Sequence, residues 1–248
     1  TIIEIAPRIL PRMLDDEGAV IVQGWLEERG IKIMAGVEVT SIEDASGGGK
    51  IVKLKSGTDV NADLVIMATG IKTNLEWLEG SGIEVNHGVV VNDHLRSSES
   101  NVYAAGDVAE GPDLLSEGKV VHAIEPTAMQ HGRVVGANMA GVDTAFEGSL
   151  LMNIVDVLDL EIASFGRWDD EKLEVVRVVQ AGRPAYRKLL FEEGRLVGAI
   201  VLGRTRDIWA TNDVGMIKGL VQGKCELSEW KAHLKKNPFD IKCAYLAA

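Results

Sequence analysis

The stretch that decides the fold reads Asn101-Val-Tyr-Ala-Ala-Gly-Asp-Val-Ala109 and, after a polar loop, Ile124-Glu-Pro-Thr-Ala-Met-Gln-His-Gly-Arg-Val-Val-Gly-Ala-Asn-Met-Ala-Gly141. Its β-branched and aromatic residues predict a short buried strand over residues 102–105, which Gly106 ends. Asp107 follows at the carboxyl end of that strand, where open α/β sheets bind their ligands. A helix is expected from Pro126 to Gly141, with its free N–H groups directed toward Asp107. The pattern predicts a binding site for a polyhydroxylated or anionic ligand.

Two further stretches lie upstream of this motif. Residues 63–70, Asp-Leu-Val-Ile-Met-Ala-Thr-Gly, are apolar and end in small residues, which predicts a buried strand followed by a turn. Residues 82–98 contain the run Val-Val-Val-Asn-Asp-His-Leu-Arg-Ser-Ser. A Gly-Asp pair alone is common in surface turns, so the prediction depends on the three stretches together.

Together the three stretches closely resemble the FAD- and NAD(P)H-dependent pyridine nucleotide-disulfide oxidoreductase family. The resemblance implies that Asp107 accepts a hydrogen bond from a ribityl hydroxyl of FAD and that Gly106 permits the close approach. It also implies a crossover between the NAD(P)H and FAD domains at residues 68–70 and a hairpin-like pair of strands over residues 82–98. The start of the helix would lie under the pyrimidine end of the flavin. The residues implied to contact cofactors are Ala68, Thr69, Gly70, Gly106, Asp107, Glu125, Pro126, Thr127 and Ala128.

The chain begins with an apolar strand that ends in an acid, Glu4. In a dinucleotide-binding βαβ unit, the second strand ends in an acid that accepts hydrogen bonds from the adenosine ribose. Glu4 therefore favours NADH over NADPH, whose 2′-phosphate more often meets an arginine, although Arg8 leaves phosphate binding open. The alternative is that Glu4 is an ordinary charge at the end of a strand.

No Gly-x-Gly-x-x-Gly turn occurs in the chain, and the run Gly47-Gly48-Gly49 precedes a strand, so it predicts a hairpin turn. In the family that the chain resembles, two Gly-rich turns and any redox-active cysteine lie N-terminal to this point. We therefore expect a C-terminal portion of a longer or split enzyme, whose partner is the N-terminal FAD/NAD half. Catalytic residues stay unassigned.

The predicted fold class is α/β, with partial Rossmann-like NAD(P)- and FAD-binding domains followed by an α+β C-terminal interface domain. The expected boundaries are residues 1–70 for the NAD(P)H part, 71–146 for the FAD part and 147–248 for the interface domain. Asp15 or Asp16 can cap a helix that Gly30 ends. In the last domain, residues 150–160 predict a strand followed by a turn, residues 174–180, 185–191 and 196–203 predict strands, and residues 205–220 and 228–236 predict helices.

Charge and composition limit the partners. The 248 residues carry a net charge of −11, which argues against nucleic acid and anionic membranes. No apolar run reaches the roughly 20 residues of a membrane span. The only cysteines, Cys225 and Cys243, have no metal-ligand spacing, so we expect no metal site and a reducing, cytoplasmic setting.

The predicted function is that of a flavoprotein segment that passes hydride from NADH to FAD and then to oxygen or a redox-protein acceptor. The sequence shows no His–Glu pair near His233, which disfavours thiol–disulfide chemistry of the glutathione-reductase kind. Lys231, Lys235 and Lys236 form a basic cluster that could dock an acidic carrier. We expect a homodimer. The alternative is a non-catalytic interaction subunit that assembles with a separate FAD-binding chain.

Overall fold

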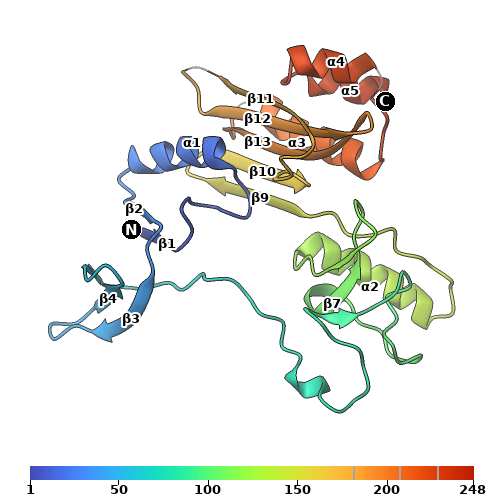
Figure 1. Cartoon of the computed structure of the whole chain (residues 1–248), viewed down its shortest axis with the longest axis horizontal. Helices are drawn as coiled ribbons and strands as arrows, with labels where there is room; N and C mark the ends of the chain where they lie inside the picture. Colours follow the sequence, from blue (N-terminus) through green and yellow to red (C-terminus); the bar gives the residue numbers. More distant parts are fainter. Residues whose placement is uncertain (181, 207, 228) are drawn as a thin grey trace.

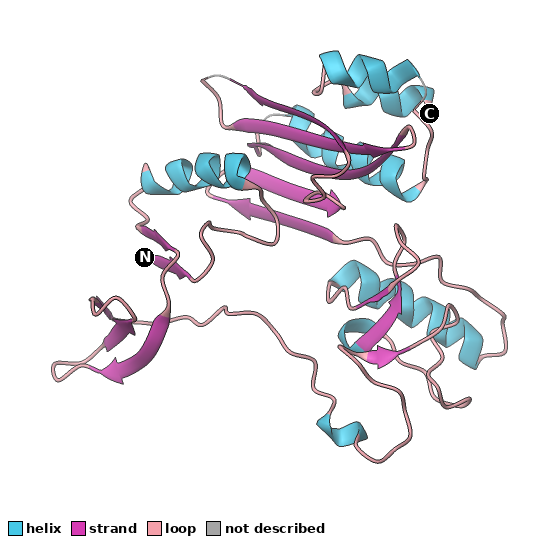
Figure 2. Ribbon diagram, viewed as in Figure 1, coloured by secondary structure: helices cyan, strands magenta, loops and turns pink. Residues whose placement is uncertain are grey.

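The structure is a computed structural model that describes residues 1–180, 182–206, 208–227 and 229–248, with the side chains of 208–211 left out. Within these residues the chain forms a five-stranded sheet, two three-stranded sheets and a two-stranded parallel pair, together with helices (Figures 1 and 2). This mixed arrangement confirms the predicted α/β class. None of the described helices is long and apolar enough to cross a membrane.

The five-stranded sheet is antiparallel and occupies the C-terminal part of the chain. Its strands lie in the order β11-β12-β13-β10-β9. The four strands predicted here form as β9, β11, β12 and β13, whereas β10 was not predicted. The strand bounds are β9 Met152–Val157, β10 Leu160–Gly166, β11 Glu174–Gln180, β12 Ala185–Glu192 and β13 Arg195–Arg204.

Both faces of this sheet are covered. One face packs against α3 (Ile208–Gln222), α4 (Glu229–Lys236) and α5 (Ile241–Ala247). The other face packs against α1 (Asp16–Glu27). Figure 1 shows α1 beside the sheet although more than a hundred residues separate them in sequence. Leu189 and Leu190 are consecutive on β12 and lie in opposite cores, because side chains alternate along a strand. The apolar runs of the central strands therefore supply side chains to two cores, one on each face of the sheet.

The N-terminal residues form a βαβ unit. Strand β1 (Ile2–Glu4) runs parallel to β2 (Ile33–Ala35), with α1 between them. Asp15 caps α1, since its Oδ1 accepts the Gly18 N–H at 3.1 Å. Gly30 follows the helix with a φ of +83°, as the sequence predicts. A small antiparallel sheet then follows, made of β3 Val39–Asp44, β4 Lys50–Leu54 and β5 Asp59–Ala62.

The middle of the chain builds a separate, smaller core. Buried members of this core include Leu78, Val89, Leu95 and Phe146. Helix α2 contributes partly buried valines to it. The elements are η1 Glu76–Leu78, β6 Val89–Val90, η2 Gly106–Val108, β7 Ala109–Pro112, β8 Lys119–Val120 and α2 Glu125–Met139.

Three predicted strand regions are wrong or incomplete. Residues 63–69 form no strand and are largely exposed, with Ile66 81% accessible. No described strand pairs with this segment, and an extended segment without neighbours can bury neither its backbone groups nor its side chains. Residues 102–105 contribute only a bridge between Tyr103 and Arg96, because the pairing is made by β7 beyond Gly106. Residues 82–98 contribute β6, a bridge between Val85 and Val89, and the Arg96 side of the bridge to Tyr103.

Candidate functional site

The turn at Gly106 lies against the start of α2. Gly106 opens η2 with a φ of +74°, in the left-handed region that favours glycine. A Cβ at this position would lie 3.5 Å from the Cβ of Ala128. The Gly106 N–H donates to Nδ1 of His131 at 3.2 Å. The next residue, Asp107, is exposed. The structure therefore brings the Gly-Asp turn and the first turns of α2 together.

The start of α2 provides free backbone donors. Its N-cap residue, Ile124, makes no side-chain cap, and its carbonyl accepts the Ala128 N–H at 3.1 Å. Pro126 lies in the first turn, and Glu125 is exposed. Thr127 is only 3% accessible and lines a small cavity with Met152 of β9 and Lys218 of α3. Its N–H belongs to the first turn of the helix, whose N–H groups have no partner within the helix. The partial positive charge of the helix start favours an anionic group there.

Glu4 ends β1 with its carboxylate turned back on the chain. Its Oε1 accepts the Ala6 N–H at 2.8 Å, and its carbonyl accepts the Val37 N–H at 3.0 Å. Within the described residues, its second carboxylate oxygen makes no hydrogen bond. Arg8 is engaged elsewhere, because it pairs with Asp16 at 3.0 Å and donates to the Leu14 carbonyl. The phosphate-binding role that the sequence leaves open for Arg8 therefore competes with these contacts.

Residues 68–70 stand apart from both groups. Ala68, Thr69 and Gly70 are exposed and form no regular element, and Gly70 has a φ of +101°. In Figure 2 this segment is part of a long connection between the β3–β5 sheet and η1. No hydrogen bond within the described residues joins it to Glu4 or Asp107. The predicted site residues thus fall into four groups, which are Glu4, residues 68–70, the Gly106 turn and the α2 start. Only the Gly106 turn and the α2 start are in contact.

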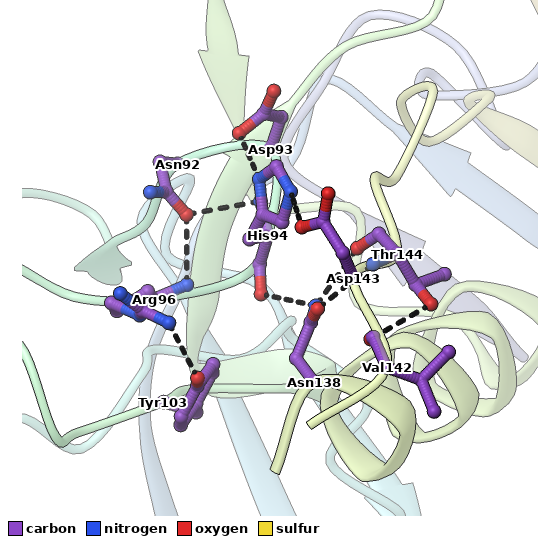
Figure 3. A network of polar contacts seen from close by, with 9 residues as sticks. All are labelled: Asn92, Asp93, His94, Arg96, Tyr103, Asn138, Val142, Asp143 and Thr144. Atoms are coloured by element: carbon purple, nitrogen blue, oxygen red, sulfur yellow. Dashed lines mark hydrogen bonds and ion pairs between the residues drawn. The ribbon is translucent and has the colours of Figure 1, made fainter. Parts of the chain in front are cut away.

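A polar network near the far end of α2 was not found from the sequence (Figure 3). His94 Nδ1 lies 2.6 Å from Asp93, and its Nε2 lies 3.0 Å from Asp143. The hydrogen bonds with the two carboxylates raise the pKa of His94 above its usual value. Asn138 of α2 donates to the carbonyls of His94 and Thr144. The network ties the loop at residues 92–96 to the end of α2, across a separation of 49 residues between His94 and Asp143.

A second unpredicted network joins α1 to the C-terminal sheet. The Tyr186 hydroxyl donates to Asp15 Oδ2 at 2.7 Å, and Lys188 Nζ lies 3.1 Å from the same oxygen. Tyr186 and Lys188 are fully buried. Burial, followed by the hydrogen bond to Asp15, raises the pKa of Tyr186 well above its usual value. The two residues are two apart on β12 and so reach the α1 cap from one face.

The C-terminal helices contain charged contacts that bear on two predictions. His233 Nε2 lies 2.7 Å from Asp240, seven residues further along the chain, so its acidic neighbour is an aspartate and not the glutamate of a His–Glu pair. Two lysines of the predicted docking cluster, Lys231 and Lys235, both pair with Glu174 of β11. Their charge is therefore partly neutralised within the chain, and the docking of an acidic carrier at this cluster stays a prediction. The described residues contain no group of three or more His, Cys, Asp or Glu that could hold a metal ion.

The fold and the Gly-Asp turn define a class of protein. A profile of the pyridine nucleotide-disulphide oxidoreductase family matches residues 1–132, and a profile of the rubredoxin NAD+ reductase C-terminal domain matches residues 152–213. The chain belongs to the pyridine nucleotide-disulphide oxidoreductase family.

Several known proteins are similar to this chain. An NADH oxidase of Methanocaldococcus jannaschii is 31% identical over 83% of this chain and 49% of its own length. A rubredoxin-NAD(+) reductase of Pseudomonas putida is 32% identical over 58% of this chain and 37% of its own length. The structure of an NAD-dependent persulfide reductase from A. fulgidus superimposes with a TM-score of 0.81 at 27% identity, covering 92% of this chain and 44% of that one. The chain therefore spans half or less of the length of these proteins.

Proposed function

We propose that this chain is the C-terminal portion of an FAD-dependent NAD(P)H oxidoreductase, which passes hydride from NADH to FAD and then electrons to oxygen or a redox protein. The observation that carries the proposal is the contact between the Gly106–Asp107 turn and the start of α2. This contact assembles an exposed carboxylate and free backbone donors within one small region.

The hydrogen-bonding groups of this region suit FAD. Asp107 can accept a hydrogen bond from a ribityl hydroxyl, and such a bond to a charged group contributes about 1.5–3 kcal/mol. Gly106 has no Cβ to obstruct the ligand. The N–H groups of Glu125 and Thr127, with Pro126 and Ala128 shaping the turn, can stabilise negative charge at the N1/C2 edge of the flavin. When bound, the flavin supplies the hydride and electron chemistry, and the protein positions and polarises it.

The nicotinamide cofactor is assigned to the N-terminal βαβ unit. Glu4 retains one carboxylate oxygen free of hydrogen bonds within the described residues, which suits the ribose hydroxyls of NADH. Arg8 is held by Asp16 and Leu14, which makes it a poorer group for the 2′-phosphate of NADPH. Ala68, Thr69 and Gly70 are assigned to the crossover, where small residues allow both cofactors to approach the backbone.

An N-terminal FAD/NAD half is the expected partner. The relatives are at least twice as long as the matched segment, and residues 63–71 expose Leu64, Ile66, Met67 and Ile71 at 71% or more. We propose that this half pairs with the segment and buries those side chains. The division into residues 1–70, 71–146 and 147–248 follows from the same proposal, and the small core between Leu75 and Phe146 supports its middle unit.

The proposal also covers the electron acceptor, the oligomeric state and the cellular compartment. One relative is named for rubredoxin, which supports a redox-protein acceptor, and another is named an NADH oxidase, which supports oxygen. We propose a homodimer formed through the C-terminal domain. The two cysteines are free, which supports a reducing cytoplasm.

The visible absorption spectrum, recorded with the intact mass of the same sample, tests the assignment. Flavin bands that bleach with NADH in a sample containing the N-terminal half support the reductase. Asp107→Asn should then weaken FAD binding about tenfold, whereas the exposed control Asp169→Asn should not. A colourless sample with the N-terminal half and added FAD present would favour the non-catalytic alternative.

A further inference from the structure

His131 lies directly behind the Gly106–Asp107 turn. It is 2% accessible and one turn after Ala128 on the same face of α2. Its Nδ1 accepts the Gly106 N–H at 3.2 Å. Ala128 and His131 therefore support Gly106 together, the first by its methyl group and the second by a hydrogen bond.

The hydrogen bond identifies the form of the imidazole. Because an N–H donates to Nδ1, that nitrogen carries a lone pair, and the neutral ring holds its proton on Nε2. Nε2 is buried without a hydrogen-bond partner among the described residues. Burial also lowers the pKa of His131, in agreement with a neutral ring.

The ring has little freedom to turn. It packs edge-to-face against Phe146, with ring centroids 4.7 Å apart and planes at 88°. Its Cε1 lies 4.0 Å from the position that a Cβ on Gly111 would take. Phe146 is itself anchored, because its N–H donates to the Asp93 carbonyl at 2.7 Å. The acceptor is therefore held at a fixed point behind the turn.

Asp107 depends on its backbone for direction. Within the described residues, no hydrogen bond holds its carboxylate, and the preceding glycine could adopt other conformations. A fixed acceptor for the Gly106 N–H removes that freedom. A leucine of similar volume at position 131 would leave the N–H without this partner, and a protonated imidazole would offer no lone pair.

We propose that His131 is a positioning residue for FAD: its Nδ1 holds the Gly106 peptide so that Asp107 points at the ligand hydroxyl. The inference rests on the proposed function of the same site. His131 therefore differs from a residue that only fills the core, because its effect on FAD binding depends on Asp107.

The first test uses the 248-residue chain itself. In ¹⁵N-labelled protein, the Nδ1 resonance of His131 should be that of an unprotonated nitrogen, and the Gly106 amide should exchange slowly. His131→Leu should speed that exchange about tenfold, and His131→Gln, whose amide oxygen can accept the bond, should restore most of the protection. A protonated Nδ1, or equal exchange in all three proteins, would overturn the inference.

The second test uses the protein together with its N-terminal half and FAD as the titrant. His131→Leu should raise the Kd for FAD about tenfold, and His131→Gln less than threefold. The double variant His131→Leu/Asp107→Asn should bind FAD no more weakly than Asp107→Asn alone. Additive effects, or wild-type affinity in His131→Leu beside a weakened Asp107→Asn, would overturn the positioning role and leave the flavin site standing. Wild-type affinity in Asp107→Asn would instead reject the proposed function.

Discussion

Two apolar regions of this chain reach opposite outcomes. Strands β12 and β13 are almost completely buried, and most of their residues are apolar although β12 also contains Arg187 and Lys188. Helix α1 covers one face of their sheet, and α3 and α5 cover the other. Residues 63–71 are also mostly apolar, yet Leu64 and Ile66 are 75% and 81% accessible. The difference lies in the neighbours and not in the composition, since an extended segment is buried only where other elements flank it.

Removing the link between α1 and the sheet should have the largest effect. Asp15→Ala removes the helix cap and leaves the fully buried Lys188 with only the longer contact to Glu171, at 3.4 Å. We expect a loss of about 4 kcal/mol in the free energy of unfolding, measured with urea. Asp16→Ala, in an exposed pair with Arg8, should cost less than about 1 kcal/mol. Equal losses would mean that α1 is not held by this link.

The same carboxylate should make the fold sensitive to acid. Burial opposes ionisation of Asp15, but the hydrogen bonds from Tyr186, Gly18 and Lys188 prevail and hold its pKa below the usual 3.8. The stability from this ionised group is therefore present above pH 3.8 and is lost as the pH falls through the lower pKa of the folded state. Asp15→Asn, which can still cap the helix, should lose this part of the pH dependence in melting curves between pH 2 and 5.

Truncation of one leucine in each region compares burial directly. Leu190→Ala should cost about 3 kcal/mol, because Leu190 is completely buried in the core between α1 and the sheet. Leu64→Ala should change the stability of this chain by less than about 0.5 kcal/mol. If the N-terminal half covers residues 63–71 as proposed, Leu64→Ala should weaken the binding of that half. If Leu64→Ala destabilised the isolated chain as much as Leu190→Ala does, Leu64 would already be buried in solution.

Alanine at two glycines should shift stability in opposite directions. Gly106→Ala has room for its Cβ, 3.5 Å from Ala128, but the φ of +74° should cost about 1 kcal/mol. Gly132 lies in α2 with no atom within 4 Å of an added Cβ, so Gly132→Ala should gain about 0.5–1 kcal/mol. Thermal unfolding of both variants checks the signs. Two changes of the same sign would contradict the left-handed turn at Gly106.

The sequence by itself determined the local elements. Short-range patterns account for the Asp15 cap, the turn at Gly47 to Gly49, the start of α2 at Pro126 and four of the five strands of the C-terminal sheet. Such patterns are visible because caps, turns and alternation depend on residues only a few positions apart. The Gly-Asp motif and the family resemblance also came from contiguous residues.

Only the tertiary structure decided which of these elements meet. The bond from Gly106 to His131, the contacts of Asp15 with Tyr186 and Lys188, and the pairing of His94 with Asp143 join residues between 25 and 173 positions apart. Nothing local marks such a pair, because the energy of a buried hydrogen bond depends on the surroundings that folding creates. The exposure of residues 63–71 has the same origin. Their apolar sequence predicts burial, but burial requires neighbours that a run of amino acids does not itself supply.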